Sequence, residues 1–174
     1  LKAMTNLSRN PETRSALGAY QERLEEIVEQ AIPIQQIPAP TLEEEGRARF
    51  FEEQFKAHGL VDVYRDAVNN VYGRLPGASS ALQPVVVSAH LDTVFPMSTD
   101  LAIRREGSLI YGAGIGDNST GLVGLLQTAQ AIRDNQLAHA ADIHFVANVC
   151  EEGLGDLRGM RAVVDRFGGE AFYI

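Results

Sequence analysis

Three short stretches of the 174-residue sequence place histidine or acidic side chains just after an apolar run or in a glycine-rich loop. The first, SAHLDTVFP, holds His90 and Asp92 two residues apart, directly after the run PVVV. The second, GIGDNSTG, holds Asp117, and the third, CEEG, holds Glu151 and Glu152. One neutral imidazole and several carboxylates form a ligand set that suits zinc, or a related divalent ion such as cobalt or manganese. These residues therefore predict a metal site.

The spacing within two of these stretches has a chemical interpretation. A metal-binding imidazole usually donates its second N–H to a carboxylate, and Asp92 could be that partner of His90 across a strand-end bend. Consecutive side chains leave an extended backbone in opposite directions. One of Glu151 and Glu152 could then bind metal while the other stays free as a general base.

Each stretch alone also has a simpler interpretation. The histidine could be an ordinary hydrogen-bonded strand residue, the aspartate a turn residue, and the acidic pair a solvated surface. In open α/β sheets, functional groups gather beyond the carboxyl ends of strands, where loops converge. The order of the three stretches and their common position after strands favour the metal site.

Composition and charge exclude several classes of partner. Hydrophobic residues make up 45% and charged residues 22% of the chain, as in an ordinary globular domain. The net charge is −8 and no Lys/Arg cluster is present, so we expect no nucleic acid partner. No apolar run approaches the roughly 20 residues of a membrane span, so we expect no membrane partner. Cys150 is the only cysteine, which excludes an internal disulfide and favours the cytoplasm.

Helices are expected in the first third of the chain. Apolar residues at three- and four-residue steps predict a helix over about 11–31. The prolines of IPIQQIPAP then predict an extended connector. A second helix is predicted over about 41–58, opened by a capping box of Thr41 with Glu44 and closed by Gly59.

After the hairpin predicted near Gly107, strands alternate with helices, which predicts a layered α/β domain with a mixed sheet. The run PVVV is typical of a strand that is covered on both faces. Ser119 is expected to cap a helix that continues to about Ile132, and LRGMRAVVDRFGG is expected to form another. The predicted strands and hairpin lie in VDVYRD, NVYGRL, PVVVSAH, LAIRREGSLIYG (a hairpin turning near Gly107), ADIHFVANVCEEG and AFYI.

Taken in order, SAHLDTVFP, IYGAGIGDNSTG and CEEGLGD resemble the motifs of the co-catalytic zinc exopeptidases and deacylases, the family of peptidase T, aminoacylase and acetylornithine deacetylase. The resemblance extends from about Ala16 to Ile174. It implies an α/β fold with three αβα layers and a mixed, mostly parallel sheet. It also implies hydrolysis of an amide bond in small peptides or N-acyl amino acids by metal-activated water.

The resemblance implies a role for each candidate residue. His90 would bind one zinc, Glu152 would bind a second, and Asp117 would bridge the two. The catalytic residues would be Glu151, as the general base, and Asp92, which would orient His90. The peptide bond after Asp117 would be cis.

The sequence also departs from the family pattern. The family has two further ligands after the Glu-Glu motif, one of them a late histidine, but all four histidines of this chain precede that motif. The chain also begins without Met and contains no lid domain. We therefore expect residues 1–174 to be the N-terminal segment of a catalytic domain, without its C-terminal part and without the lid, which in this family usually mediates homodimer formation. The chain alone is expected to bind metal poorly or be metal-free, and to be inactive.

Two other functions stay open at this point. The chain could be a metal-free, non-catalytic remnant or binding module with the same fold. It could also be a nucleotide-binding α/β domain, since GAGIGD precedes a predicted helix. The three glycines of that stretch do not form the G-x-G-x-x-G pattern, which makes nucleotide binding the weaker alternative.

Overall fold

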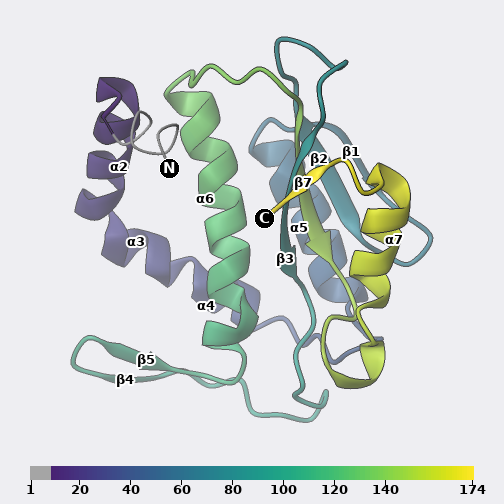
Figure 1. Ribbon diagram of the computed structural model, residues 1–174. Helices are drawn as coiled ribbons and strands as arrows, with labels where there is room; N and C mark the ends of the chain where they lie inside the picture. Colours follow the sequence, from purple (N-terminus) through teal and green to yellow (C-terminus); the bar gives the residue numbers. More distant parts are fainter. Residues whose placement is uncertain (1–8) are drawn as a thin grey trace.

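Residues 9–174, the part of the chain that the computed structural model describes, begin with helices, continue with five strands and then alternate between helix and strand (Figure 1). Residues 1–8, on which the prediction about the chain start rests, lie outside the described residues. The helices are α2 (Pro11–Glu22), α3 (Leu24–Glu29), α4 (Ala31–Gln35), α5 (Glu45–Ala57), α6 (Thr120–Asp134) and α7 (Arg158–Phe167). The strands are β1 (Val61–Arg65), β2 (Val71–Leu75), β3 (Val85–His90), β4 (Arg104–Glu106), β5 (Leu109–Tyr111), β6 (Ile143–Asn148) and β7 (Phe172–Tyr173).

The main sheet has five strands in the order β1-β2-β6-β3-β7. The pairings of β1 with β2 and of β2 with β6 are antiparallel, whereas β3 pairs in parallel with both β6 and β7. The sheet is therefore mixed, as predicted. Because β3 and β6 are parallel neighbours, with His90 opposite Asn148, their carboxyl ends meet at one edge of the sheet. Strands β4 and β5 form the predicted hairpin, which is separate from this sheet.

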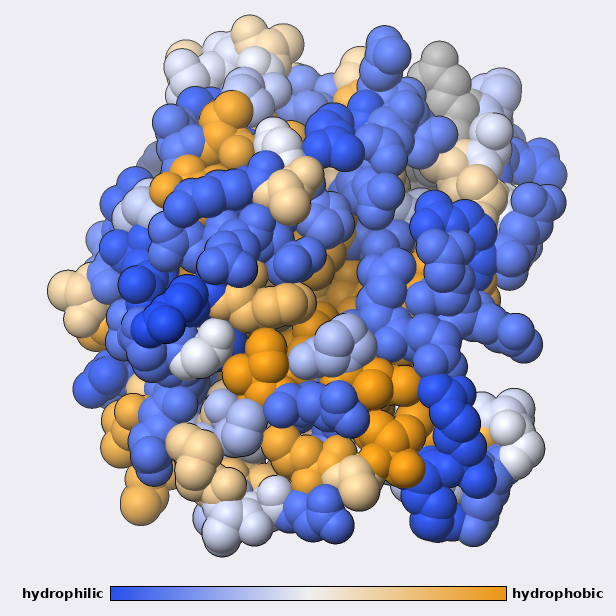
Figure 2. All heavy atoms as spheres, turned by 180° about the vertical axis from the view of Figure 1, so that it is seen from behind, coloured by the Kyte–Doolittle hydropathy of each residue, from blue (hydrophilic) through white to orange (hydrophobic). Residues whose placement is uncertain are grey.

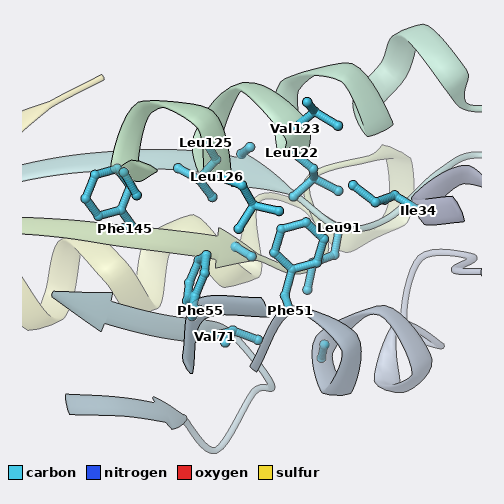
Figure 3. Packing of buried hydrophobic residues seen from close by; sticks show 14 of the residues in the cluster. Ile34, Phe51, Phe55, Val71, Leu91, Leu122, Val123, Leu125, Leu126 and Phe145 are labelled. Atoms are coloured by element: carbon cyan, nitrogen blue, oxygen red, sulfur yellow. The ribbon is translucent and has the colours of Figure 1, made fainter. Parts of the chain in front are cut away.

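Helices cover both faces of the sheet and give the predicted three layers (Figure 1). On one face, α5 packs on β1 and β2, while α6 packs on β3 and β6. Figure 3 shows the large apolar cluster of this face, where side chains of α5 and α6 point toward one another across Leu91. The other face is covered by α7, whose Val163 packs with Val86 of β3. Val86 and Val87 thus face opposite layers, as expected for the run PVVV.

The single helix predicted over 11–31 is wrong in its extent. The segment instead forms α2, α3 and α4, with breaks at Arg23 and Gln30. Pro33 lies in the first turn of α4, where a backbone N–H has no helical acceptor and a proline is tolerated. A short helix that contains this proline therefore forms where the sequence predicted an extended connector.

Both predicted helix caps are also wrong. Helix α5 begins at Glu45, and no side chain caps its N-terminus. The Ser119 hydroxyl does not cap α6 but donates to the carbonyl of Gly114, 2.8 Å away. Gly59 does follow α5 with a left-handed φ of 72°, as predicted. Within the described residues no helix is both long and apolar enough to cross a bilayer.

Candidate metal centre

His90 ends β3 and points its imidazole into the space beyond the strand ends. Its Nδ1 lies 3.1 Å from the carbonyl oxygen of Asp92 and 3.5 Å from a carboxylate oxygen of the same residue. Both of these oxygens accept hydrogen bonds, so a proton on Nδ1 would have acceptors there. Nε2 lies 2.9 Å from Oδ1 of Asp117. Burial opposes the charged imidazolium, but the hydrogen bond and charge of Asp92, with the charges of Glu151 and Asp117, outweigh it and raise the pKa of His90.

Asp92 is fully buried, and hydrogen bonds occupy both of its carboxylate oxygens. Oδ1 accepts from the backbone N–H of Glu151, and Oδ2 accepts from that of Glu152, each at 3.0 Å. The hydroxyl of Thr41 donates to Oδ2 at 2.9 Å. Burial alone would raise the pKa of Asp92, but these bonds and the bond to His90 outweigh it and lower the pKa to about 2.

Asp117 lies in the turn Ile115–Ser119 that leads into α6, and its peptide bond to Asn118 is cis, as the resemblance implies. Gly114, just before this turn, has a left-handed φ of 72°. The Asp117 side chain is 76% exposed. In Figure 1 the loop before α6 and the loops after β3 and β6 come together at the lower end of the molecule.

Glu151 and Glu152 follow β6, but their side chains differ in surroundings. Ligand atoms of Glu152, His90 and Asp117 all lie within 4.8 Å of one another. Glu151 stands beside this group, with Oε2 4.0 Å from His90 Nε2, and its side chain is 40% exposed. Burial raises the pKa of Glu152, and the negative charge of Asp117 raises it further.

The chemistry of these donors fits a divalent cation. One imidazole nitrogen and two carboxylates are ligands of zinc and of related ions. The other ring nitrogen of His90 is held by Asp92, the arrangement that usually orients a metal-binding imidazole. Acidic groups this close to one another favour a positive charge among them. All five residues that the sequence predicted for the site therefore lie together, although their roles remain predictions.

Three residues that support the site were not predicted from the sequence. Thr41 and Glu44, predicted to cap a helix, instead bind Asp92 and the backbone N–H of Cys150. Arg47 is buried and donates to three backbone carbonyls, including that of Leu91 at 2.8 Å. The partners in these hydrogen bonds lie 10 or more positions apart in sequence, so no local pattern pointed to these contacts.

A groove of about 320 Å³ opens beside Glu152. Most of its lining is apolar, and several lining side chains are exposed, among them Val94 and Leu154. Seen from behind, apolar residues gather in the lower half of the molecule, toward the end where β3 and β6 terminate (Figure 2). The residues that line the groove are Pro40, Thr41, Leu42, Thr93, Val94, Phe95, Pro96, Glu152, Gly153 and Leu154.

Comparisons with known proteins show the family and the fold. Residues 70–166 match the sequence profile of Peptidase family M28. The chain is 32% identical over 132 residues to a succinyl-diaminopimelate desuccinylase of Corynebacterium glutamicum, a match that covers 74% of this chain and 34% of the relative. The chain thus spans about a third of the length of the curated relative it matches.

Two solved structures illustrate the similarity in fold. A tripeptidase of Staphylococcus aureus is 25% identical, with a TM-score of 0.65 over 79% of this chain and 40% of its own. Human carnosine dipeptidase 1 is 15% identical, with a TM-score of 0.71 over 92% of this chain and 40% of its own. At that identity the second similarity concerns the fold alone.

Proposed function

The chain belongs to peptidase family M28 and has the fold of metal-dependent peptidases and deacylases, and from this premise we propose that it provides the active-site carboxylates of an amide hydrolase. The observation that carries the proposal is the approach of His90, Asp117 and Glu152 to within 4.8 Å, with Glu151 beside them. We propose small peptides or N-acyl amino acids as substrates, because the relatives are named as a desuccinylase and as peptidases.

In this proposal each side chain has one task. Nε2 of His90 and the carboxylates of Asp117 and Glu152 hold the cation, for which zinc is the first candidate and cobalt or manganese the next. When bound, such a cation supplies Lewis acidity, which polarises a carbonyl and lowers the pKa of water. Asp92 keeps the proton of His90 on Nδ1, so that Nε2 is available as a ligand.

Glu151 is proposed as the general base. Its carboxylate lies next to the ligands without belonging to the group of three, and its partial exposure leaves it open to water and substrate. It would take a proton from the attacking water and later deliver one to the leaving amine. The groove beside Glu152 would hold an apolar part of the substrate, since most of its lining is apolar.

The domain organisation is part of the proposal. Three donors are fewer than two four-coordinate cations require, even when Asp117 is shared. We therefore propose that residues 1–174 are the N-terminal segment of a catalytic domain, and that further ligands, a lid and a homodimer contact belong to another part of the protein. By itself the chain is then expected to bind metal weakly and to be inactive. The buried, unpaired Cys150 favours a reducing cytoplasm.

The proposal is tested by replacing Glu151 in the full-length protein. Glu151→Gln keeps the shape of the side chain but removes the base, so kcat should fall by about a hundredfold or more on peptide and N-acyl amino acid substrates. Metal content, measured by elemental analysis, should stay unchanged. Glu53→Gln, an exposed change on α5, is the control and should leave both values unaltered.

Two outcomes would count against the proposed roles. Unchanged turnover in Glu151→Gln would remove Glu151 as the base. A wild-type protein that holds no metal and hydrolyses none of these substrates would instead favour the alternative, a metal-free binding module with this fold.

A further inference from the structure

Three consecutive backbone N–H groups after β6 all donate to buried carboxylates from other parts of the chain. The N–H groups of Glu151 and Glu152 donate to the two oxygens of Asp92. The N–H of Cys150, one residue earlier, donates to Oε1 of Glu44 at 3.0 Å. The backbone that carries the two glutamates is therefore held by two carboxylates and not by a strand partner.

Among the described contacts, the Glu44 side chain accepts hydrogen bonds only from backbone N–H groups and one thiol. Its side chain lies outside the group of possible metal ligands, and the residue is only 5% exposed. Oε1 also accepts from the N–H of Leu42 at 2.9 Å and from the thiol of Cys150 at 3.4 Å. Within the described residues, no ion pair forms with this carboxylate. A buried carboxylate that relies on two backbone N–H groups and a thiol is costly unless all of them stay in place.

The backbone at Cys150 needs such support. Its φ is 54°, in the left-handed region that residues other than glycine rarely adopt. This conformation turns the chain away from the direction of β6 just before Glu151. Glu44 binds both the N–H and the thiol of the turning residue, which favours this conformation over the more extended alternatives.

We propose that Glu44 is a positioning residue that sets the direction of Glu151 and Glu152 through the backbone of Cys150. Thr41 extends the same support, because its hydroxyl donates to Asp92, which holds the next two N–H groups. The segment 41–44 thus connects the loops after β3 and β6 from outside the sheet. The expected effect on metal affinity rests on the function proposed above, whereas the effect on the backbone does not.

The test compares Glu44→Ala with Glu44→Gln in the 174-residue chain. Glutamine retains a carbonyl oxygen that can accept from Cys150, whereas alanine retains none. Hydrogen exchange of the backbone N–H groups of residues 150–152, followed by NMR, should quicken about tenfold or more in Glu44→Ala and about threefold or less in Glu44→Gln. Co²⁺ affinity, with Co²⁺ titrated alone as the probe, should fall more in Glu44→Ala than in Glu44→Gln.

A stability-matched control separates positioning from general loss of structure. Val163→Ala removes apolar volume beneath α7, away from the candidate site, and should lower overall stability without selective exchange at residues 150–152. If Glu44→Ala does not fold, Thr41→Val takes its place, and it should speed exchange at Glu152 by about threefold.

The inference is overturned if Glu44→Ala resembles Val163→Ala in both measurements, or if Thr41→Val, used in its place, leaves exchange at Glu152 unchanged. It is also overturned if Glu44→Gln is as impaired as Glu44→Ala, because the accepted hydrogen bond would then not be the cause. Selective exchange in the 174-residue chain, together with a full-length protein that holds no metal and hydrolyses none of these substrates, would support the positioning role of Glu44 and count against the proposed function alone.

Discussion

Beneath α6, fully buried side chains such as Phe51, Leu122 and Phe145 contact other apolar groups, whereas at the ends of β3 and β6 the fully buried side chains include Asp92. The stability of the apolar layer comes from buried area and filled volume, to which many neighbouring side chains contribute. The structure of the strand ends instead depends on individual hydrogen bonds, because each carboxylate oxygen of Asp92 accepts from particular donors. The first region gives the fold its stability, and the second gives the candidate site its shape.

Arg47 shows how charge is handled at the strand ends. Its guanidinium donates to the carbonyls of Ile37, Leu91 and Gln35, so its hydrogen bonds go to the backbone. Burial lowers its pKa to about 10, and the charge of Asp92 opposes that change. A positive charge fixed near Asp92 helps to keep that carboxylate ionised. The two regions should therefore respond to mutation in different ways.

The largest expected effect on stability comes from the apolar layer. Leu126→Ala should lower the free energy of unfolding by about 2–5 kcal/mol, because it removes a buried side chain and leaves a cavity. Urea unfolding gives this value. Co²⁺ affinity of the folded protein should stay within about twofold of wild type. A large loss of Co²⁺ affinity would show that the two regions are not separate.

A smaller loss of stability with a larger effect on the site is expected from Asp92→Asn. Both carboxylate oxygens accept backbone N–H groups, so the NH₂ group of asparagine must face one of these donors. The free energy of unfolding should fall by about 1–3 kcal/mol. Co²⁺ affinity should fall about tenfold, a change that Leu126→Ala does not produce. Asp165→Asn, an exposed change on α7, is the matched control.

The last expected effect is a pH dependence that belongs to the strand ends alone and appears only in acid. The pKa of Asp92 is lowered in the folded chain, from 3.8 to about 2. Its stabilising contribution, about 2 kcal/mol, is therefore complete above pH 3.8 and is lost as the pH falls toward 2. Urea unfolding between pH 3.8 and 2 should show a decrease in the free energy of unfolding that is missing in Asp92→Asn. If the free energy of unfolding depended on pH in the same way in both proteins, Asp92 would not be the group responsible.

The same comparison explains what the sequence could predict. The strands, the α/β layers and four of the candidate residues were predictable because the apolar runs that precede His90, Asp92, Glu151 and Glu152 carry their signal locally. Parallel strand ends meet at one edge, so residues after β3 and β6 were expected to come together. The turn that carries Asp117 follows from its glycines and from the helix after it.

The supporting contacts could not be predicted in the same way. A Thr followed three residues later by Glu is the pattern of a helix cap, yet Thr41 and Glu44 bind Asp92 and Cys150, which are far along the chain. The tertiary contacts form here in place of the local helix cap, because Asp92 and the Cys150 N–H are buried and need hydrogen-bond partners. The breaks at Arg23 and Gln30 likewise have no glycine or proline at the break itself.

The parallel register of β3 and β6 limits how the length of this chain can vary. His90 lies opposite Asn148, and Asp92, Glu151 and Glu152 follow within a few positions of these strand ends. Deleting one residue from either strand would shift its end by about 3.3 Å and turn alternate side chains to the other face. Insertions in the connection 76–84, which lies at the other end of β3, would leave that alignment intact. Homologous chains should therefore differ in length at one end of the sheet and keep a constant spacing at the other.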